Sequence, residues 1–531
     1  MTSAQPRVAI HEMLADASRI ATGLAEDKVA SSIAAKDVTL WGSAAESSAA
    51  VRLNWVDLAA TSGPLLARIA ELRTELASFG VHRVLLAGTG GPALAATAIC
   101  RADGVPLTVL DTADAGQVGD ALAGDLASTV LVVASRSGTA LVADSVQRIF
   151  TEQFTAAGLA PAEHIVVVTD PGSPLHHRAE DDGIAVVEAD PRVGDAYSAL
   201  TAFALVPAGL AGADLGALLD DSAAAEELLG QDEVDNPALL LGAALATGAA
   251  RVVLADTGSD LDGSAVAGFG DWAGQLVAAA TGLLPVVVEG PTAPGFGDGE
   301  ATSVALGSTL DADPGGAQLS TAGPLGGQFV LWQYAVAVAA RLLGVDPFDE
   351  LDDAIAEAAT RVLLDEAPDS GPEPSFTDGA IEVFAGDWLP AGAERTAAAA
   401  VRALLAAAPE YSHLSIEAYL DRIEDASAAV LRPELARRSG LPTSFGWGPR
   451  RPRPTGPDQR VGGPDGVYLH LTGAVAADVA VPGRPYTLAA LQIAQARGDA
   501  EVLVERGRPV LRLHLTDREV GFVQLAAALL G

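Results

Sequence analysis

The chain has 531 residues, and its 69 acidic against 32 basic side chains give a formal net charge of −37. A field of this sign repels phosphate backbones and anionic lipids, which argues against nucleic-acid or membrane-surface binding. Salt adaptation or a high-GC genome would produce the same acidity. The length predicts roughly three or four domain-sized units, and the Ala- and Gly-rich apolar half of the sequence favours an α/β class.

Cysteine usage and the N-terminus predict a cytoplasmic protein. Cys100 is the only cysteine, so no intramolecular disulfide is possible. The first residues lack a basic-then-apolar signal pattern, and no run approaches the about 18 apolar residues of a membrane span. His176 and His177 adjoin without a familiar metal-ligand spacing, so we expect no metal site.

The first half of the chain predicts a helical arm over residues 1–60 and then a first α/β domain over 61–230. A helix from Leu65 to about Ser78 leads into an apolar strand at 83–87 and a glycine-rich turn. Four more apolar runs follow, at 106–111, 128–135, 164–170 and 184–190. Continuous apolar runs are typical of strands covered on both faces, so we expect a doubly wound, mostly parallel sheet.

The second half predicts a similar domain, a linker and a third unit. The pattern Arg-Val-x-Leu-Ala-x-Thr-Gly occurs at 83–90 and again at 251–258, which indicates a second α/β domain over 231–365. The Pro-, Ser- and acid-rich stretch 366–379 is typical of a linker. Residues 380–531 predict a C-terminal α/β segment, with helices at 394–408 and 416–423, strands at 466–472 and 509–515, and a closing helix from Asp517.

Two segments offer donors to an anion. The turn with Gly88, Gly90 and Gly91 exposes backbone N–H groups at a helix start, although ordinary βα turns are also rich in glycine. Ser135, Ser137 and Thr139 lie between a strand and a helix. Helix capping would explain one of these hydroxyls but not easily three. The sequence therefore favours a phosphate site, with the second segment as the stronger indication.

These segments resemble the sugar isomerase (SIS) domain, and four longer stretches, 188–214, 268–282, 324–350 and 443–473, resemble the phosphoglucose isomerase family in order along the chain. They are most similar to its actinobacterial branch and to the isomerase part of fused transaldolase–isomerase proteins. The resemblance runs from about Val29 to the C-terminus. It implies two SIS domains, interconversion of glucose 6-phosphate and fructose 6-phosphate in glycolysis and gluconeogenesis, no cofactor, and either a homodimer or a monomer with dimer-like packing.

Carried over residue by residue, the resemblance also shows where the chain departs from the family. The family's catalytic Arg, Glu, ring-opening His and Lys fall on Ala196, Ala279, Tyr334 and Glu357. Its phosphate loop becomes Ser135, Arg136, Ser137, Gly138 and Thr139, with Arg in place of Lys, and its first turn has Pro92 and Ala93 in place of two serines. The implied phosphate-binding residues are Gly88, Gly90, Gly91, Ser135, Arg136, Ser137 and Thr139.

Two main hypotheses remain open. The chain is a glucose-6-phosphate isomerase in which other groups do the chemistry, or it is a catalytically impaired relative that binds a sugar phosphate or has a regulatory role. Glu188, Glu357 or Asp195 would be the substitute base, and Arg136 or Arg450 the substitute cation. An isomerase for another phosphosugar is a third possibility.

Overall fold

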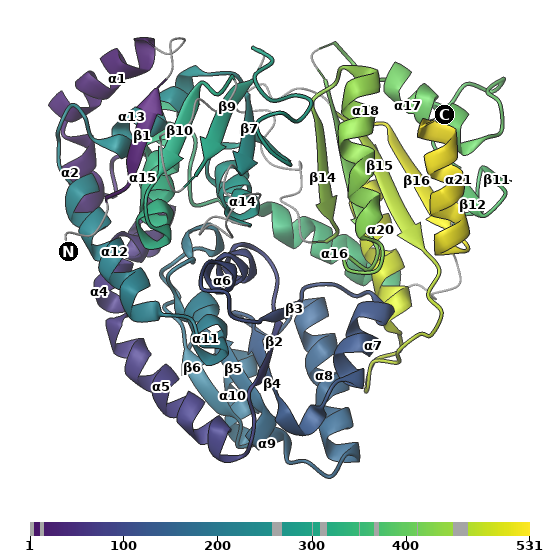
Figure 1. Ribbon diagram of the computed structural model, residues 1–531, viewed down its shortest axis with the longest axis horizontal. Helices are drawn as coiled ribbons and strands as arrows, with labels where there is room; N and C mark the ends of the chain where they lie inside the picture. The colour runs from purple at the N-terminus through teal and green to yellow at the C-terminus, as the bar shows by residue number, and fades with distance from the viewer. Residues whose placement is uncertain are drawn as a thin grey trace. The chain divides into compact units, whose positions relative to one another are not determined.

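The computed structural model describes residues 5–10, 15–256, 268–299, 301–307, 316–349, 351–365, 371–410, 412–449 and 466–530 (Figure 1). The chain divides into two compact units. The first comprises Met1–Val109, Asp125–Glu350 and Gly456–Gly463, and the second comprises Leu110–Gly124, Leu351–Thr455 and Pro464–Gly531. Arg450 lies outside the described residues. No described helix is both long enough and apolar enough to cross a bilayer.

The first sheet has five strands in the order β3-β2-β4-β5-β6. Its strands are β2 (Arg83–Ala87), β3 (Thr108–Leu110), β4 (Thr129–Ala134), β5 (Ile165–Thr169) and β6 (Ala185–Glu188). The pairs β2 with β4, β4 with β5 and β5 with β6 are parallel. Each strand falls within one of the apolar runs, so the predicted mostly parallel sheet is confirmed.

Helices before, between and after these strands cover the first sheet. They are α5 (Gly63–Ser78), α6 (Gly91–Ala102), α8 (Leu141–Ala156), α9 (Pro161–His164), α10 (Pro174–Asp181) and α11 (Ala202–Ala211), and the short helix η3 (Asp195–Tyr197) precedes α11. Helix α11 packs against α5, α6 and β2. Its residues from Ala202 to Leu210 are all buried, because the helix is surrounded by other elements.

The second sheet has the order β1-β10-β9-β7-β8. Its strands are β1 (Arg7–Ile10), β7 (Arg251–Asp256), β8 (Leu284–Val288), β9 (Thr302–Leu306) and β10 (Leu319–Ala322). Strand β1 corrects the expectation that residues 1–60 are all helical. It pairs antiparallel with β10, so the edge of the sheet supplies backbone partners that a four-residue apolar segment lacks by itself.

The remaining helices of the first unit form the arm and the layers of the second sheet. They are α1 (Ala15–Glu26), α2 (Val29–Ala34), α3 (Glu46–Arg52), η1 (Asn54–Asp57), α4 (Leu58–Thr61), α12 (Leu215–Leu229), α13 (Pro237–Thr247), α14 (Phe269–Thr281) and α15 (Leu325–Leu343). Helix α15 is buried from Leu325 to Ala340 and packs against α12, α13 and α14. It is the central helix of this core.

The second unit contains a six-stranded sheet in the order β11-β12-β16-β15-β13-β14. Its strands are β11 (Phe376–Asp378), β12 (Ile381–Ala385), β13 (His413–Tyr419), β14 (Thr443–Trp447), β15 (Gly466–Gly473) and β16 (Val510–Leu515). Its helices are α7 (Ala115–Ala123), α16 (Leu351–Asp365), α17 (Ala397–Ala406), η4 (Ala426–Val430), α18 (Leu431–Ser439), α20 (Leu488–Glu505) and α21 (Arg518–Leu530), with the short helix η2 (Leu126–Ser128) following α7 in the first unit.

Strand β13 corrects the predicted helix at 416–423. All seven residues of the strand are buried, and it pairs in parallel with β14 on one side and β15 on the other. Apolar residues at 416, 419, 420 and 423 have helical spacing, but they run past the end of the strand, whereas polar and apolar residues alternate over 413–418 as in a strand. The predicted strands at 466–472 and 509–515 are confirmed as β15 and β16.

Candidate functional site

The strand order of the first sheet reverses between β2 and β4, and we call the region beyond the carboxyl ends of these two strands the crevice. From β2 the chain crosses to β3 on one side, and from β4 it continues to β5 and β6 on the other. Open parallel sheets bind ligands at such a reversal of strand order. The two segments predicted to hold phosphate follow these two strands, and the register pairs Ala87 with Val133 at their ends. The fold therefore brings the glycine turn and the hydroxyl loop together.

The glycine turn makes close backbone contacts. Gly90 precedes α6 with a φ of 79°, which is the left-handed region where glycine is favoured. A Cβ on Gly88 would lie 3.1 Å from the Cβ and O of Ala134, and a Cβ on Gly91 would lie 3.0 Å from the backbone O of Asp195. Helix η3 thus lies against the turn, and Pro92 offers no N–H at the start of α6.

The hydroxyl loop is held by bonds among its own residues. The Gly138 N–H donates to Ser135 Oγ at 3.1 Å, and the hydroxyls of Ser137 and Thr139 are 2.7 Å apart. Gly138 has a φ of 74°, and a Cβ there would lie 2.5 Å from Leu175 Cβ. Ser135 is buried while Thr139 is exposed, so the loop presents hydroxyls at its outer edge in a preformed conformation.

Arg136 pairs with two carboxylates. Its Nε donates to Asp195 Oδ1 at 2.5 Å, its Nη1 donates to Asp170 Oδ2 at 3.2 Å, and its Nη2 donates to the carbonyl of Val193. Burial raises the pKa of Asp170, and the nearby Arg136 charge acts in the opposite direction. The side chain predicted to face a phosphate is therefore already surrounded by acceptors of the protein itself.

Two further polar side chains lie at the crevice, and sequence reasoning missed both. Arg178 of α10 donates from Nη2 to the carbonyl of Gly138 at 3.4 Å. The Nε2 atom of Gln275, on α14, lies 3.5 Å from the position of a Cβ on Gly90. Among the described residues, the buried Oε1 of Gln275 has no hydrogen-bond partner. Arg178 lies outside the family-like stretches, and Gln275 lies within the stretch 268–282 but was not singled out there. Tertiary packing brings α10 and α14 to these loops.

Comparison with known proteins was made by family model, by sequence and by structure. No family model matches the chain. Over 180 residues it is 31% identical to a probable glucose-6-phosphate isomerase of Haloarcula marismortui, covering 33% of this chain and 40% of that protein. Over 125 residues it is 34% identical to the glucose-6-phosphate isomerase of a Synechococcus species, covering 23% and 24%. The matched segments thus span less than half of these relatives.

Solved structures share the fold over a longer stretch. A hypothetical protein of Thermus thermophilus aligns with a TM-score of 0.54 and 20% identity, covering 66% of this chain and 96% of that one. A glucose-6-phosphate isomerase of Chlamydia trachomatis aligns with a TM-score of 0.51 and 16% identity, covering 67% and 88%. The chain is thus similar to glucose-6-phosphate isomerases over part of its length. The resemblance inferred from the sequence and the expected SIS-type α/β fold are both confirmed.

The family's catalytic positions in the first unit carry no proton-transferring side chain near the turn. Ala196 is half-buried in η3, and Ala279 is exposed on α14, the helix that packs against both η3 and α6. Tyr334 is buried in α15, with its ring edge-on to Trp55 at 5.3 Å. Burial raises the pKa of Tyr334, as do the nearby charges of Glu226 and Asp57.

Glu357, the fourth family position, belongs to the second unit. It lies on α16, where its Oε1 accepts from Arg361 Nη2 at 2.6 Å, one helical turn away. This pair is the local i,i+4 arrangement common on helix surfaces. Within the second unit, the Glu357 carboxylate is therefore part of a local ion pair with Arg361.

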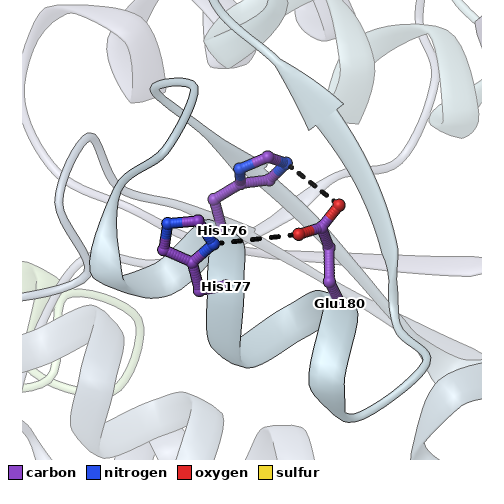
Figure 2. Close-up of side chains that lie close together, drawn as sticks. All are labelled: His176, His177 and Glu180. Atoms are coloured by element: carbon purple, nitrogen blue, oxygen red, sulfur yellow. Dashed lines mark ion pairs between the residues drawn. The ribbon is translucent and has the colours of Figure 1, made fainter.

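His176 and His177 do come together with an acid, which the spacing along the chain did not reveal (Figure 2). The ligand atoms of these histidines and of Glu180 lie within 4.8 Å of one another. However, the Gly172 N–H donates to His176 Nδ1 at 3.0 Å, so Nε2 carries the proton in the neutral ring. The Nε2 atom lies 3.6 Å from Glu188 Oε1 and 3.7 Å from Glu180 Oε1. With Nδ1 already accepting a hydrogen bond and Nε2 protonated, the neutral His176 ring has no free lone pair for a metal.

A partly buried carboxyl lies elsewhere in the first unit. Glu226 of α12 accepts from the Ala59 N–H at 3.0 Å, and its pKa is raised from the ordinary value of 4.5 to about 7. Burial is the main cause, and Asp57 adds repulsion although Lys36 opposes it. Lys36 pairs with Asp57 at 2.8 Å. Glu226 is therefore a group that titrates near neutral pH, and no sequence pattern pointed to it.

Proposed function

We propose that the chain binds glucose 6-phosphate or fructose 6-phosphate in the crevice between the glycine turn and the hydroxyl loop, and that it belongs to glycolysis and gluconeogenesis as an aldose–ketose isomerase. The observation that carries the proposal is the position of the two loops. They lie side by side at the reversal of strand order in the first sheet, in a fold shared with a glucose-6-phosphate isomerase.

The crevice offers three kinds of group to a phosphate. The glycine turn contributes backbone groups at the start of α6, and the hydroxyl loop contributes the side chains of Ser135, Ser137 and Thr139. Arg178 contributes a cation beside Gly138. Backbone N–H groups, short hydroxyls and guanidinium groups are all suited to phosphate oxygens. The sugar would then extend toward η3 and α14, where Gln275 carries a buried amide oxygen with no partner among the described residues.

Isomerisation needs more than phosphate binding. A base must carry a proton between C1 and C2, and a cation must stabilise the enediolate. Asp195, whose backbone lies against the glycine turn, and Arg136 are the candidates for these two roles, but their 2.5 Å ion pair neutralises both charges. Turnover would require them to separate when the sugar binds.

A second candidate function is binding without turnover, as an impaired or regulatory relative. The observation that favours it is the lack of proton-transferring groups at Ala196 and Ala279, together with the engagement of Arg136 by two carboxylates. A protein of this kind keeps the scaffold and the phosphate loops but loses the groups that act on the sugar carbons.

The experiment is an isomerase assay run beside a binding measurement. Purified full-length chain is given glucose 6-phosphate, and fructose 6-phosphate formation is followed against a mock purification, with and without a chelator. Calorimetry with both sugars measures binding. Turnover supports the isomerase, binding without turnover supports the impaired relative, and absence of both overturns the proposed site. Because we expect no cofactor, the chelator should leave any turnover unchanged.

A further inference from the structure

Asp195 touches both segments that are proposed to hold phosphate. Its backbone carbonyl lies 3.0 Å from the position of a Cβ on Gly91, in the glycine turn. Its carboxylate accepts from Arg136 Nε at 2.5 Å, in the hydroxyl loop. One residue of η3 therefore connects the two sides of the crevice, and its charge lies where a phosphate would have to be accommodated.

The partners of Arg136 keep its guanidinium directed at the protein. Besides Asp195, the group donates to Asp170 and to the carbonyl of Val193, and it lies 5.6 Å from the ring centroid of Phe203. All three guanidinium nitrogens thus have an acceptor within the first unit. A phosphate that recruits Arg136 has to share it or to displace one of these acceptors, and such displacement costs part of the binding energy.

Charge acts in the same direction. Asp170 and Asp195 both pair with Arg136, and the charge of Arg52 also acts on Asp170. The Asp195 side chain is 55% exposed, so its charge can repel a phosphate dianion that approaches the loop. Arg178, beside Gly138, acts in the opposite direction and attracts the dianion.

We propose that Asp195 is a specificity-determining residue that holds Arg136 in an internal ion pair and thereby lowers the affinity of this crevice for phosphate dianions. This inference rests on the proposed sugar-phosphate site. In this role the residue acts through Arg136. It follows that the native chain favours ligands that bring enough other contacts to open the pair, and that it holds inorganic phosphate poorly.

The test compares Asp195→Asn with the native chain, using inorganic phosphate and glucose 6-phosphate as probes in calorimetry. Removing one like charge near a dianion is expected to tighten phosphate binding by roughly tenfold at low ionic strength. The gain should shrink in about 0.5 M salt, because screening weakens interactions between partly exposed charges. Asp195→Ala gives a second variant should the asparagine protein fold poorly, and melting curves check both.

Two controls separate this role from a general charge effect. Asp195→Glu keeps the charge and should keep the weak phosphate binding of the native chain. Glu188→Gln removes one charge at the end of β6, where the side chain faces His176 and not Arg136, and should change phosphate binding less than twofold. An equal gain from Glu188→Gln would overturn the role assigned to Asp195.

The outcomes distinguish this inference from the proposed function. Native binding of glucose 6-phosphate with no gain in Asp195→Asn would overturn the inference and leave the proposed function standing. A native chain that neither binds nor converts the sugar, beside an Asp195→Asn variant that gains phosphate binding, would support the inference and overturn the proposed function. Absence of binding in every variant would overturn both.

Discussion

The six-stranded sheet of the second unit, here called the third sheet, and the first sheet both carry ionisable side chains beside parallel strands. The two sheets differ in where these side chains lie. In the third sheet, Glu417 and Tyr419 of β13, His470 of β15 and Asp499 of α20 are each at most 5% exposed. The Tyr419 hydroxyl donates to Asp499 and, at 3.3 Å, to Glu417 Oε2, while His470 Nε2 lies 3.5 Å from the same oxygen. These groups lie within the unit and hold one another.

In the first sheet, the charged groups lie beyond the strand ends. Arg136 and Asp170 follow β4 and β5 in loops, Asp195 follows β6 at the start of η3, and their side chains are 21%, 22% and 55% exposed. Water and a ligand can both reach such groups, whereas only the protein reaches those of the third sheet. The comparison teaches that substitutions in the third sheet should change stability and that substitutions at the first sheet should change binding.

The largest expected effect is that of Tyr419→Phe. Loss of the hydroxyl removes a donor from Asp499 and Glu417 within a buried cluster, which should lower the free energy of unfolding by about 2–3 kcal/mol. Urea denaturation followed by fluorescence measures it. Tyr486→Phe is the matched control, because the Tyr486 hydroxyl is buried with no hydrogen-bond partner among the described residues. Equal losses in the two variants would break the comparison.

Glu226→Gln tests a group between the two extremes, partly buried and close to another acid. Its folded pKa of about 7 lies above the ordinary 4.5, so the folded chain keeps a proton that the unfolded chain has released. Stability from this group is complete below about pH 4.5 and is lost as the pH rises through 7. The glutamine should raise the free energy of unfolding by about 2 kcal/mol at pH 8, allowing for partial exposure.

Denaturation curves at pH 5 and pH 8 check this prediction. The difference between Glu226→Gln and the native chain should nearly vanish at the lower pH. Glu227→Gln, an exposed neighbour on the same helix, should change stability little at either pH. A gain that does not depend on pH would mean that packing and not protonation is responsible.

The smallest expected effect is that of Gln275→Leu, and it should appear in binding alone. The Gln275 Oε1 has no partner among the described residues, so removing it leaves no broken hydrogen bond there. One hydrogen bond to the sugar is worth about 1 kcal/mol, so the affinity for glucose 6-phosphate should fall roughly fivefold. Calorimetry beside a melting curve measures both quantities. A large drop in melting temperature without weaker binding would assign Gln275 to the core.

Much of the first sheet could be predicted from the sequence, since five continuous apolar runs can be buried only as covered strands. The same reasoning failed at β13, where the polar residues Ser415 and Glu417 are buried on one face of the strand, so the segment is not a continuous apolar run. Segment Arg7–Ile10 forms a strand by pairing with β10, which lies more than 300 residues further along the chain. The local sequence does not reveal so remote a partner, and a helix was therefore expected there. The domain boundaries predicted from composition remain predictions.

The sequence by itself determined the fold class, the family resemblance and the two loops of the crevice, because strand patterns, glycines and hydroxyls close together in the chain are local properties. Only the tertiary structure decided that Asp195 pairs with Arg136, that Arg178 and Gln275 reach the loops, and that burial raises the pKa of Glu226. These relations depend on distance and exposure, and both are set when segments remote in sequence pack together.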